Sequence, residues 1–469
     1  MLIKIFFTNS IGTLVSRIFG FIRDMLSASI LGANIYSDIF FVAFKFPNLF
    51  RRIFAEGAFT QSFIPSFIQT TKKALFTYTI FTRFLFFLLF FSLIVTLFSE
   101  FFAKIIAFGF DDETVALSAP FVAINFYYLP LIFCVTLFGS LLQYKHHFAI
   151  TAFSTALLNI AMIGALLLFQ NYDKKTIVYA LSYGVLMGGL LQVIAHLLAL
   201  KKNNFCRLFT LGFRYRNKKD AITKESNQKF NRAFFHSILG NSTPQIVSFV
   251  DTTLASFLVT GSISYLYYGN RIFQLPLALF AIALTTGIFP KITRLLKANN
   301  EVAASKLLSQ GFWILAFLLT TSTLGGYMLS HEIVWLLFEH GSFSKNDTSN
   351  TGFVLAMYMI GLIPFGLAKL FSLWLYARMR QKEAAIIAAY ALISNLIFSF
   401  ALIQPMGVAG LALAGSLSGC VLLFFTLRSF GFKAFFAILY SKKLIILLTL
   451  ILLEWVILRY AKELIHGYL

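Results

Sequence analysis

The sequence predicts an all-α integral membrane protein whose helices cross the bilayer many times. Of its 469 residues, 59% are hydrophobic and only 12% are charged, and the mean hydropathy is +0.81. A soluble domain of this length carries about twice that share of charged residues. Phe occurs 58 times, which suits helix surfaces that face lipid. The chain is therefore expected to lie largely within a membrane.

Thirteen segments are apolar over about the 20 residues that a helix needs to cross a bilayer. The expected spans lie near residues 4–30, 35–68, 77–99, 119–143, 148–169, 176–200, 234–260, 263–292, 306–329, 350–376, 383–404, 407–428 and 441–459. The second segment is too long for one straight helix and contains Pro47 and Gly57. Because Pro disrupts helix hydrogen bonding, we expect a kinked or broken span, which a membrane tolerates where the helix lines a cavity.

The basic residues between the spans predict the orientation of the chain. Gaps after even-numbered spans are rich in Lys and Arg, whereas gaps after odd-numbered spans are neutral, mixed or acidic. The basic gaps contain Lys72 and Lys73, Lys145, the stretch 201–232, Lys291 to Lys297, Arg378 to Lys382, and Arg428 to Lys443. Cytoplasmic loops carry the excess of Lys and Arg. We therefore expect a cytoplasmic N-terminus and, after thirteen spans, a C-terminus outside the cytoplasm.

The parts of the sequence before and after its longest polar stretch, 201–232, resemble each other. The segment NSIGTLVS at 9–16 resembles NSTPQIVS at 241–248. Six spans in each half make both halves enter the membrane in the same sense, as a parallel pseudo-two-fold repeat. Transporters built this way bind substrate between the halves and rock one against the other. The predicted parts are an N-terminal six-helix half at 1–200, a basic cytoplasmic linker at 201–232, a C-terminal six-helix half at 233–430, and an extra span with its tail at 431–469.

Charged side chains lie within the first two spans, where a charge at the bilayer centre costs about 2.5–3.5 kcal/mol on insertion scales. These residues are Arg17, Arg23, Asp24, Asp38, Lys45, Arg51, Arg52 and Glu56. One interpretation is that the cations pair with these carboxylates or extend to the interface. The cations outnumber the carboxylates, however, so pairing leaves positive charge over. We therefore expect a central cationic cavity between the two halves.

The cavity charges predict an anionic substrate. Asp38, Lys45 and Arg52 are spaced by seven residues and so follow one stripe of a regular helix. Arg binds phosphate through a planar bidentate fork. Arg271 adds a cation in the eighth span. These positions predict a polyanionic substrate, such as a diphosphate.

The seventh span contains a carboxylate, Asp251. Since the sequence has no nucleotide-phosphate loop, we expect the energy for transport to come from an ion gradient, the membrane potential or the gradient of the substrate. Asp251, with Asn395 of the eleventh span, is a candidate for coupling to sodium or a proton. The alternative is that Asp251 pairs with Arg271.

Other classes of function have weaker support. The net charge of +21 is not gathered into a basic stripe on a soluble domain, so no nucleic-acid partner is expected. No serine-hydrolase elbow is present, the histidines lack ligand spacing, and Cys134, Cys206 and Cys420 are widely separated. We therefore expect no catalytic residue, no metal site and no organic cofactor.

Three segments resemble a known family. SRIFGFIRD at 16–24, DIFFVAFKFPNLFRRIFAEGAF at 38–59, and GSISYLYY at 261–268 followed by Arg271 resemble the MurJ (MviN) lipid II flippases. The resemblance extends to about residue 430. It implies a member of the multidrug/oligosaccharidyl-lipid/polysaccharide exporter superfamily in the bacterial inner membrane. Such a member moves lipid II, an undecaprenyl-diphosphate-linked peptidoglycan precursor, from the cytoplasmic to the periplasmic face.

The resemblance also implies which residues bind the substrate. The family's functional positions correspond to Arg17, Arg23, Asp38, Arg51, Arg52 and Arg271, and Asn48 and Ser264 match polar positions of its motifs. Lys45 joins them because it lies on the stripe of the second span. The expected partners are lipid II and membrane lipids, and the expected functional unit is a monomer.

The sequence departs from the family pattern at two places. Many relatives carry an acidic residue near the arginine of the eighth span, where this chain has Asn270 and Gln274. The family usually has fourteen spans, of which the last two form a groove for the lipid tail. Since one span follows the repeat here, a groove of the usual shape is not expected.

Two alternative functions remain open from the sequence. Another exporter of the same superfamily, for drugs or polysaccharide lipids, would share the fold, but an exporter of cationic drugs is expected to have an acidic cavity. A cell-wall glycosyltransferase would need catalytic carboxylates outside the membrane. The gap 330–349 supplies Glu332, Glu339 and Asp347 but is short.

Overall fold

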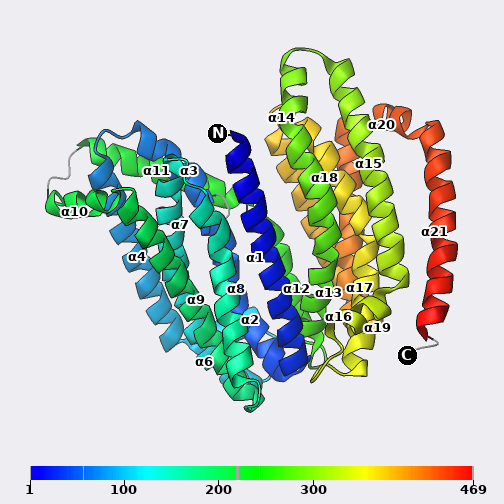
Figure 1. Ribbon diagram of the computed structural model, residues 1–469, viewed down its shortest axis with the longest axis horizontal. Coiled ribbons are helices and arrows are strands. Elements are labelled where there is room, and N and C mark those ends of the chain that lie inside the picture. The colour runs from blue at the N-terminus through cyan, green and yellow to red at the C-terminus, as the bar shows by residue number, and fades with distance from the viewer. Residues whose placement is uncertain (1, 56–57, 218–220, 242, 467–469) are drawn as a thin grey trace. The chain divides into compact units, whose positions relative to one another are not determined.

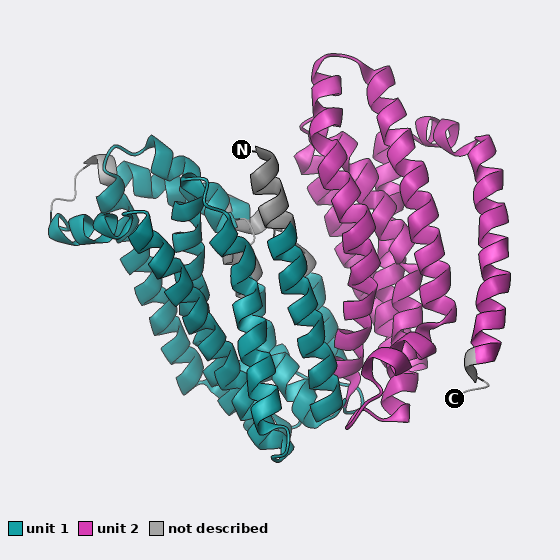
Figure 2. Ribbon diagram, viewed as in Figure 1, with its two compact units in different colours: residues 1–260 teal, residues 261–469 magenta. Residues whose placement is uncertain are grey.

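The computed structural model describes residues 2–55, 58–217, 221–241 and 243–466 (Figure 1). Within these ranges the chain folds into helices with no strand. The helices form two compact units, Met1–Thr260 and Gly261–Leu469 (Figure 2). This division follows packing, whereas the predicted halves follow sequence repetition. The predicted boundaries at 200, 232 and 430 therefore stay predictions.

The first unit follows the order of the predicted spans. Its helices are α1 (Leu2–Leu31), α2 (Ile35–Ala55), α3 (Ala58–Gln69), α4 (Lys73–Leu97), α5 (Ser99–Ile106), α6 (Asp112–Phe126), α7 (Tyr128–Tyr144), α8 (Ala149–Phe169), α9 (Lys174–Lys202), α10 (Cys206–Arg214), α11 (Ala221–Asn241) and α12 (Thr243–Ala255). The long second segment forms two helices, α2 and α3, as its length predicted. Pro47 lies inside α2, and Gly57 lies outside the described residues.

Phenylalanine forms much of the core of the first unit, as well as its outer surface. The ring of Phe59 on α3 is fully buried, and its centroid lies 5.6 Å from that of Phe133 on α7 and 5.5 Å from that of Phe230 on α11. Aromatic pairs at such distances add to the free energy of packing beyond the area that they bury. The high Phe content therefore has two roles, in the core and toward lipid.

Two capping aspartates begin helices of the first unit. Asp111 accepts a hydrogen bond from the amide of Thr114 at the start of α6, and Asp173 accepts one from Thr176 at the start of α9. Such caps satisfy backbone donors that the first turn leaves unpaired. Hydrogen bonds from the Thr114 side chain and backbone lower the pKa of Asp111 from its ordinary value.

The second unit contains the remaining predicted spans. Its helices are α13 (Ser262–Pro276), the π-helix η1 (Leu277–Ile282), α14 (Ala283–Lys297), α15 (Glu301–Met328), α16 (Ser330–Phe338), α17 (Lys345–Ile360), α18 (Leu362–Ala377), α19 (Gln381–Phe430), α20 (Phe432–Leu439) and α21 (Lys442–His466). The predicted spans 383–404 and 407–428 both fall within α19. Gly407, at the start of the second of these spans, has φ 56° and ψ −132° and breaks the helical path. Only glycine adopts such a backbone without strain.

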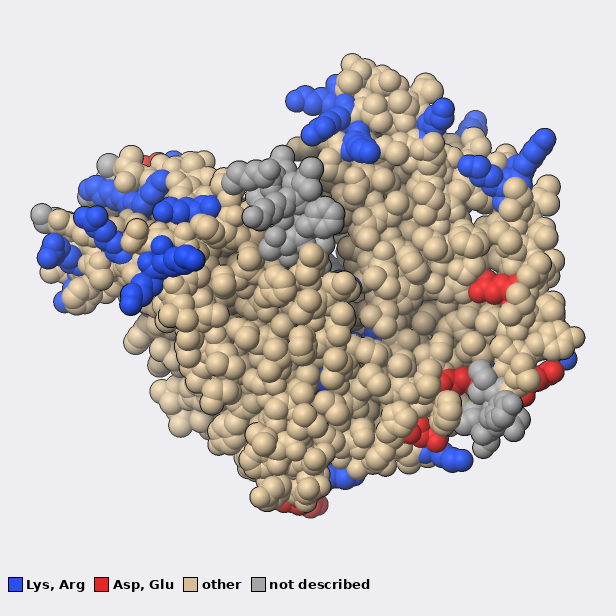
Figure 3. Space-filling view, viewed as in Figure 1, with Lys and Arg blue, Asp and Glu red and all other residues tan. Residues whose placement is uncertain are grey.

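Among the described residues, nine helical stretches are long and apolar enough to cross a membrane. The segment of α2 is not one of them, because its 21 residues include Asp38, Lys45, Arg51 and Arg52. Within each unit, Lys and Arg gather at one end (Figure 3). In the first unit this end carries α10, and in the second it carries the turn between α14 and α15. Each unit thus has one strongly basic end.

Candidate substrate-binding residues

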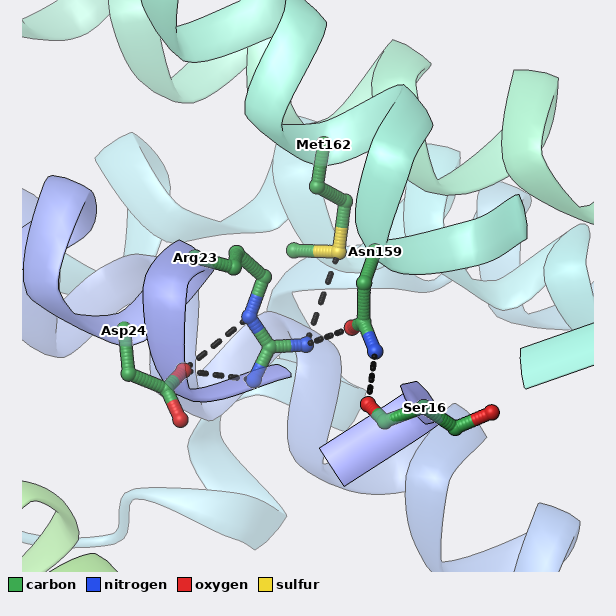
Figure 4. A network of polar contacts seen from close by, with 5 residues as sticks. All are labelled: Ser16, Arg23, Asp24, Asn159 and Met162. Carbon is green, nitrogen blue, oxygen red and sulfur yellow. Dashed lines mark hydrogen bonds and ion pairs between the residues drawn. The ribbon is translucent and has the colours of Figure 1, made fainter. Parts of the chain in front are cut away.

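Arg23 lies at the centre of a buried polar network between α1 and α8 (Figure 4). Its Nε donates to Oδ1 of Asp24 over 3.0 Å, and one terminal nitrogen lies 2.5 Å from the same oxygen. The other terminal nitrogen donates to Oδ1 of Asn159 over 3.0 Å. Asn159 in turn donates to the backbone carbonyl of Ser16 over 3.0 Å. The network joins α8 to two levels of α1.

This network places Arg23 and Asp24 in the interior of the first unit. They are 6% and 1% exposed, respectively. A buried charge is tolerated when a partner of opposite sign and hydrogen bonds compensate for lost water. In this conformation Arg23 therefore holds helices together. Its predicted contact with substrate stays a prediction.

Arg17 has different surroundings from Arg23, although both residues lie on α1. Its side chain is exposed, and it forms no hydrogen bond or ion pair within the part of the chain that the structure describes. α1 packs against α8, so Arg17 projects from a helix that is otherwise anchored. An accessible guanidinium group on an apolar helix can bind an anionic ligand without first losing a protein partner.

The predicted residues of α2 divide by depth. Asp38, in the first turn, is 2% exposed. Further on, Nε of Arg51 donates to Oδ1 of Asn48 over 3.0 Å, so two predicted residues contact each other. The side chain of Arg52 lies outside the described residues. α2 thus carries both a buried carboxylate and partly accessible polar groups.

The structure brings Lys45 and Asp251 together on neighbouring helices. Nζ of Lys45 donates to Oγ of Ser248 on α12 over 2.7 Å. Asp251 lies three residues beyond Ser248 and interacts electrostatically with Lys45. Its Oδ1 is buried and forms no hydrogen bond with any described residue. Ring contact between Phe46 and Phe249, with centroids 6.2 Å apart, packs the two helices at this level.

In the second unit, α13 carries two of the predicted residues. Ser264 is fully buried, whereas Arg271 is half-buried. Asn270 accepts a hydrogen bond from Gln274 one turn later. These two amides therefore satisfy each other on the helix that carries Arg271.

Asn395 lies on α19 in the second unit and is fully buried. Neither its Oδ1 nor its Nδ2 forms a hydrogen bond with the described residues. The residues described contain no group of three or more His, Cys, Asp or Glu side chains that could hold a metal ion. Asp251 and Asn395 belong to different units, and their joint role stays a prediction.

Comparison with known proteins identifies the family of the chain. A family model described as lipid II flippase MurJ matches residues 27–469. The chain belongs to the MurJ family of lipid II flippases. A probable lipid II flippase MurJ of Helicobacter pylori strain 26695 is 49% identical over 426 residues, covering 89% of this chain and 92% of the relative. That of Buchnera aphidicola from Acyrthosiphon pisum is 32% identical over 428 residues, covering 90% and 82%.

Solved structures support the same assignment. A lipid II flippase MurJ in an inward closed conformation has 25% sequence identity and a TM-score of 0.78, and the match covers 97% of this chain and 99% of that structure. An inward-facing MATE multidrug transporter has 12% identity and a TM-score of 0.70, covering 91% and 96%. The second match shows the shared fold alone. The chain is thus a multi-pass transporter of the bacterial inner membrane and not an enzyme.

Sequence reasoning missed two polar residues within the helices of this MurJ-family chain. Asn159 is the partner of Arg23, but it lies 136 residues away and carries no local motif. Lys369 on α18 is a charged residue within an apolar stretch, Lys345–Ala377, that is long enough to cross a membrane. The sequence does show Lys369 as unusual, because this residue interrupts a long run without charged residues.

Proposed function

We propose that the chain moves lipid II from the cytoplasmic to the periplasmic face of the inner membrane, by alternating access and as a monomer. The observation that carries this proposal is the family match over 27–469, with probable lipid II flippases of Helicobacter pylori at 49% and 50% identity. Lipid II carries an undecaprenyl diphosphate, and the accessible Arg17 is suited to grip a phosphate.

The proposed architecture has two six-helix halves, an added thirteenth span, and a cationic cavity between the halves. The order of the helices supports a repeat. A short helix, α5, precedes the pair α6–α7, which is interrupted at Tyr127. In the second unit the short helix α16 precedes the pair α17–α18, which is interrupted at Gly361. The proposed N-terminus is cytoplasmic, supported by the basic end of each unit.

The proposed driving force is a sodium or proton gradient, or the membrane potential. Carboxylate and amide oxygens are suitable ligands for hard cations. Asp251 and Asn395 each offer a buried side-chain oxygen without a hydrogen bond to described residues. These residues fit a coupling role for a small cation, with Asp251 as the charged ligand.

Complementation tests the proposed function most directly. A strain depleted of its own lipid II flippase is expected to grow when this chain is supplied, and labelled lipid II is expected to reach the outer face of its membrane. Growth should depend on accessible cationic residues such as Arg17, and cells that carry an empty vector should not grow. A chain that reaches the membrane at normal amount yet neither restores growth nor exposes lipid II would contradict the proposal.

A further inference from the structure

Lys369 lies in the middle of a membrane span. Between Asp347 and Arg378 it is the single charged residue of the sequence. It lies nine residues before Arg378, so its backbone is about 13 Å along the helix from that basic end. The hydrocarbon core of a bilayer is about 30 Å thick. Lys369 therefore lies well within the membrane.

The face of α18 that carries Lys369 is accessible and polar. Most of the helix is buried, and Lys369 and Tyr376 are its exposed residues. Phe365, Lys369, Ser372 and Tyr376 follow one another at helical spacing and share a face. Three of these four residues are polar, so the accessible face of this buried helix is not apolar.

Helix surfaces that face lipid in this protein have a different composition. On α4, Arg83 is exposed, but every exposed residue from there to the far end of the helix is aromatic or aliphatic. They include Phe86, Phe87, Phe90 and Leu93. A face that presents Lys, Ser and Tyr at the depth of the membrane is typical of a surface that lines a water-filled path. The face of Lys369 therefore differs from the lipid-facing surface.

The neighbours of this face support a role in transport. The ring of Phe365, one turn before Lys369, lies 6.3 Å from the ring of Phe273 on α13, the helix that carries Arg271. The π-helix η1 follows α13 and contacts α18. Such π-helical turns occur frequently at functional sites. Lys369 itself forms no hydrogen bond or ion pair with any residue that the structure describes.

We propose that Lys369 is a further substrate-binding residue, whose ammonium group binds a phosphate oxygen of the lipid-linked diphosphate during its passage. An accessible cation deep in a span, without a carboxylate partner in the described chain, fits an anion that arrives with the substrate. The inference rests on the proposed function and extends the cationic positions from α1, α2 and α13 to α18.

Binding measurements on the full chain in lipid nanodiscs test this inference. The probes are fluorescent lipid II and, separately, phosphatidylglycerol, whose phosphate comes from the bilayer. Lys369→Met is expected to weaken lipid II binding about tenfold, the usual effect of losing one charged hydrogen bond. Lys369→Arg keeps the charge and is expected to retain most of the affinity. Lys306→Met, the same change at an exposed position near the basic end of α15, is expected to bind as the unchanged chain does.

The outcomes separate this inference from the proposed function. Unchanged lipid II affinity in Lys369→Met overturns the inference and leaves the function intact. An equal loss of lipid II and phosphatidylglycerol binding also overturns it, because the lysine would then hold bilayer phosphate. If the unchanged chain does not prefer lipid II, both proposals fail. Should Lys369→Met not fold, the comparison of Lys369→Gln with Lys369→Arg gives the same readout.

Discussion

Two arginines of α1, six residues apart, differ in what they would need to do before binding a phosphate. Arg23 is bound by Asp24 and Asn159, so it must first break a buried ion pair. Breaking such a pair costs about 3–5 kcal/mol. Arg17 is exposed and has no partner among the described residues. Arg17 is therefore the more readily available of the two for substrate.

We expect Arg17→Ala to abolish complementation while the chain reaches the membrane at normal amount. Losing a charged hydrogen bond is worth about 1.5–3 kcal/mol, or at least a tenfold loss of affinity. Arg17→Lys should retain partial activity, because Lys lacks the bidentate fork. We expect the same of Arg52→Ala from the sequence. Arg207→Ala, at an exposed position of α10, is the control, and normal growth of Arg17→Ala would contradict an anion site there.

We expect Asn159→Leu to destabilise the first unit by about 1–3 kcal/mol, because Arg23 and the carbonyl of Ser16 each lose a buried hydrogen bond. Thermal unfolding of the purified chain in detergent measures the change, and Arg17→Gln serves as the exposed control. If Asn159→Leu unfolds at the same temperature as the control, the network does not hold α1 to α8.

We expect Asp251→Asn to weaken transport and to remove its dependence on the coupling cation. Since Lys45 is the charged neighbour of Asp251, the double variant Lys45→Gln with Asp251→Asn should be less harmful than the two single effects added together. Coupling between contacting residues is typically about 0.5–3 kcal/mol. If the effects of the two substitutions simply add and the ion dependence of transport is unchanged, the pair has no role in coupling. The double variant of Arg271→Gln with Asp251→Asn tests Arg271 as the alternative partner.

Sequence reasoning identified the charged positions and included Asp24 among the possible partners of the cations, as the Arg23–Asp24 ion pair confirms, but it did not identify partners on other helices. The stripe of α2 named Lys45, yet its contact Ser248 lies 203 residues away. No periodic pattern records which helices become neighbours. Arg23 was expected to face substrate because the motif contains it, whereas its depth of burial depends on α8. Partner identity is therefore a property of packing, and it became visible only in the fold.

At the scale of elements, apolar length predicted most helix positions well. Each expected span overlaps a described helix, because about 20 apolar residues leave few other structures possible in a membrane. The short helices α5, α10, α16 and α20 were not expected, since each is too short to show as a span. The interruption at Tyr127 between α6 and α7 was also missed, because no proline or glycine marks that residue.

We expect Gly407→Ala to cost about 1–3 kcal/mol, because its φ of 56° and ψ of −132° are nearly restricted to glycine. A Cβ at Gly407 would meet no atom within 4 Å, so the cost is one of backbone conformation. Gly287→Ala in α14 is the matched control, since its Cβ would also meet open space but the backbone is helical. That control should be neutral or stabilising. Equal melting temperatures would show that α19 does not require this bend.

We expect the C-terminal end of α21 to lie outside the cytoplasm. α21 begins at Lys442 and contacts α15, and Nζ of Lys462 donates to the carbonyl of Met328 at the far end of α15 over 2.8 Å. The same ammonium lies 3.6 Å from Glu332. A C-terminal alkaline phosphatase fusion should be active, because that enzyme works only outside. If a phosphatase fused at Arg380, in a basic gap, is active, the predicted orientation of the whole chain is wrong.

At the scale of the whole molecule, the two units share a plan but not a composition. Each has a strongly basic end (Figure 3), as insertion with cytoplasmic Lys and Arg requires. The charges deep within spans are concentrated in the first unit, whereas the second unit contributes Arg271, Lys369 and Glu454. We expect the first unit to supply most of the grip on an anionic substrate.

The division into two units also leaves every tryptophan in one of them. All four tryptophans, Trp313, Trp335, Trp374 and Trp455, lie after residue 260. Trp374 is packed against Phe430 and under the guanidinium of Arg378, 4.9 Å from its ring. Tryptophan fluorescence therefore reports on the second unit alone, whereas circular dichroism records the helices of both units. Without any label, the two signals together would reveal whether the units melt in one step or in two.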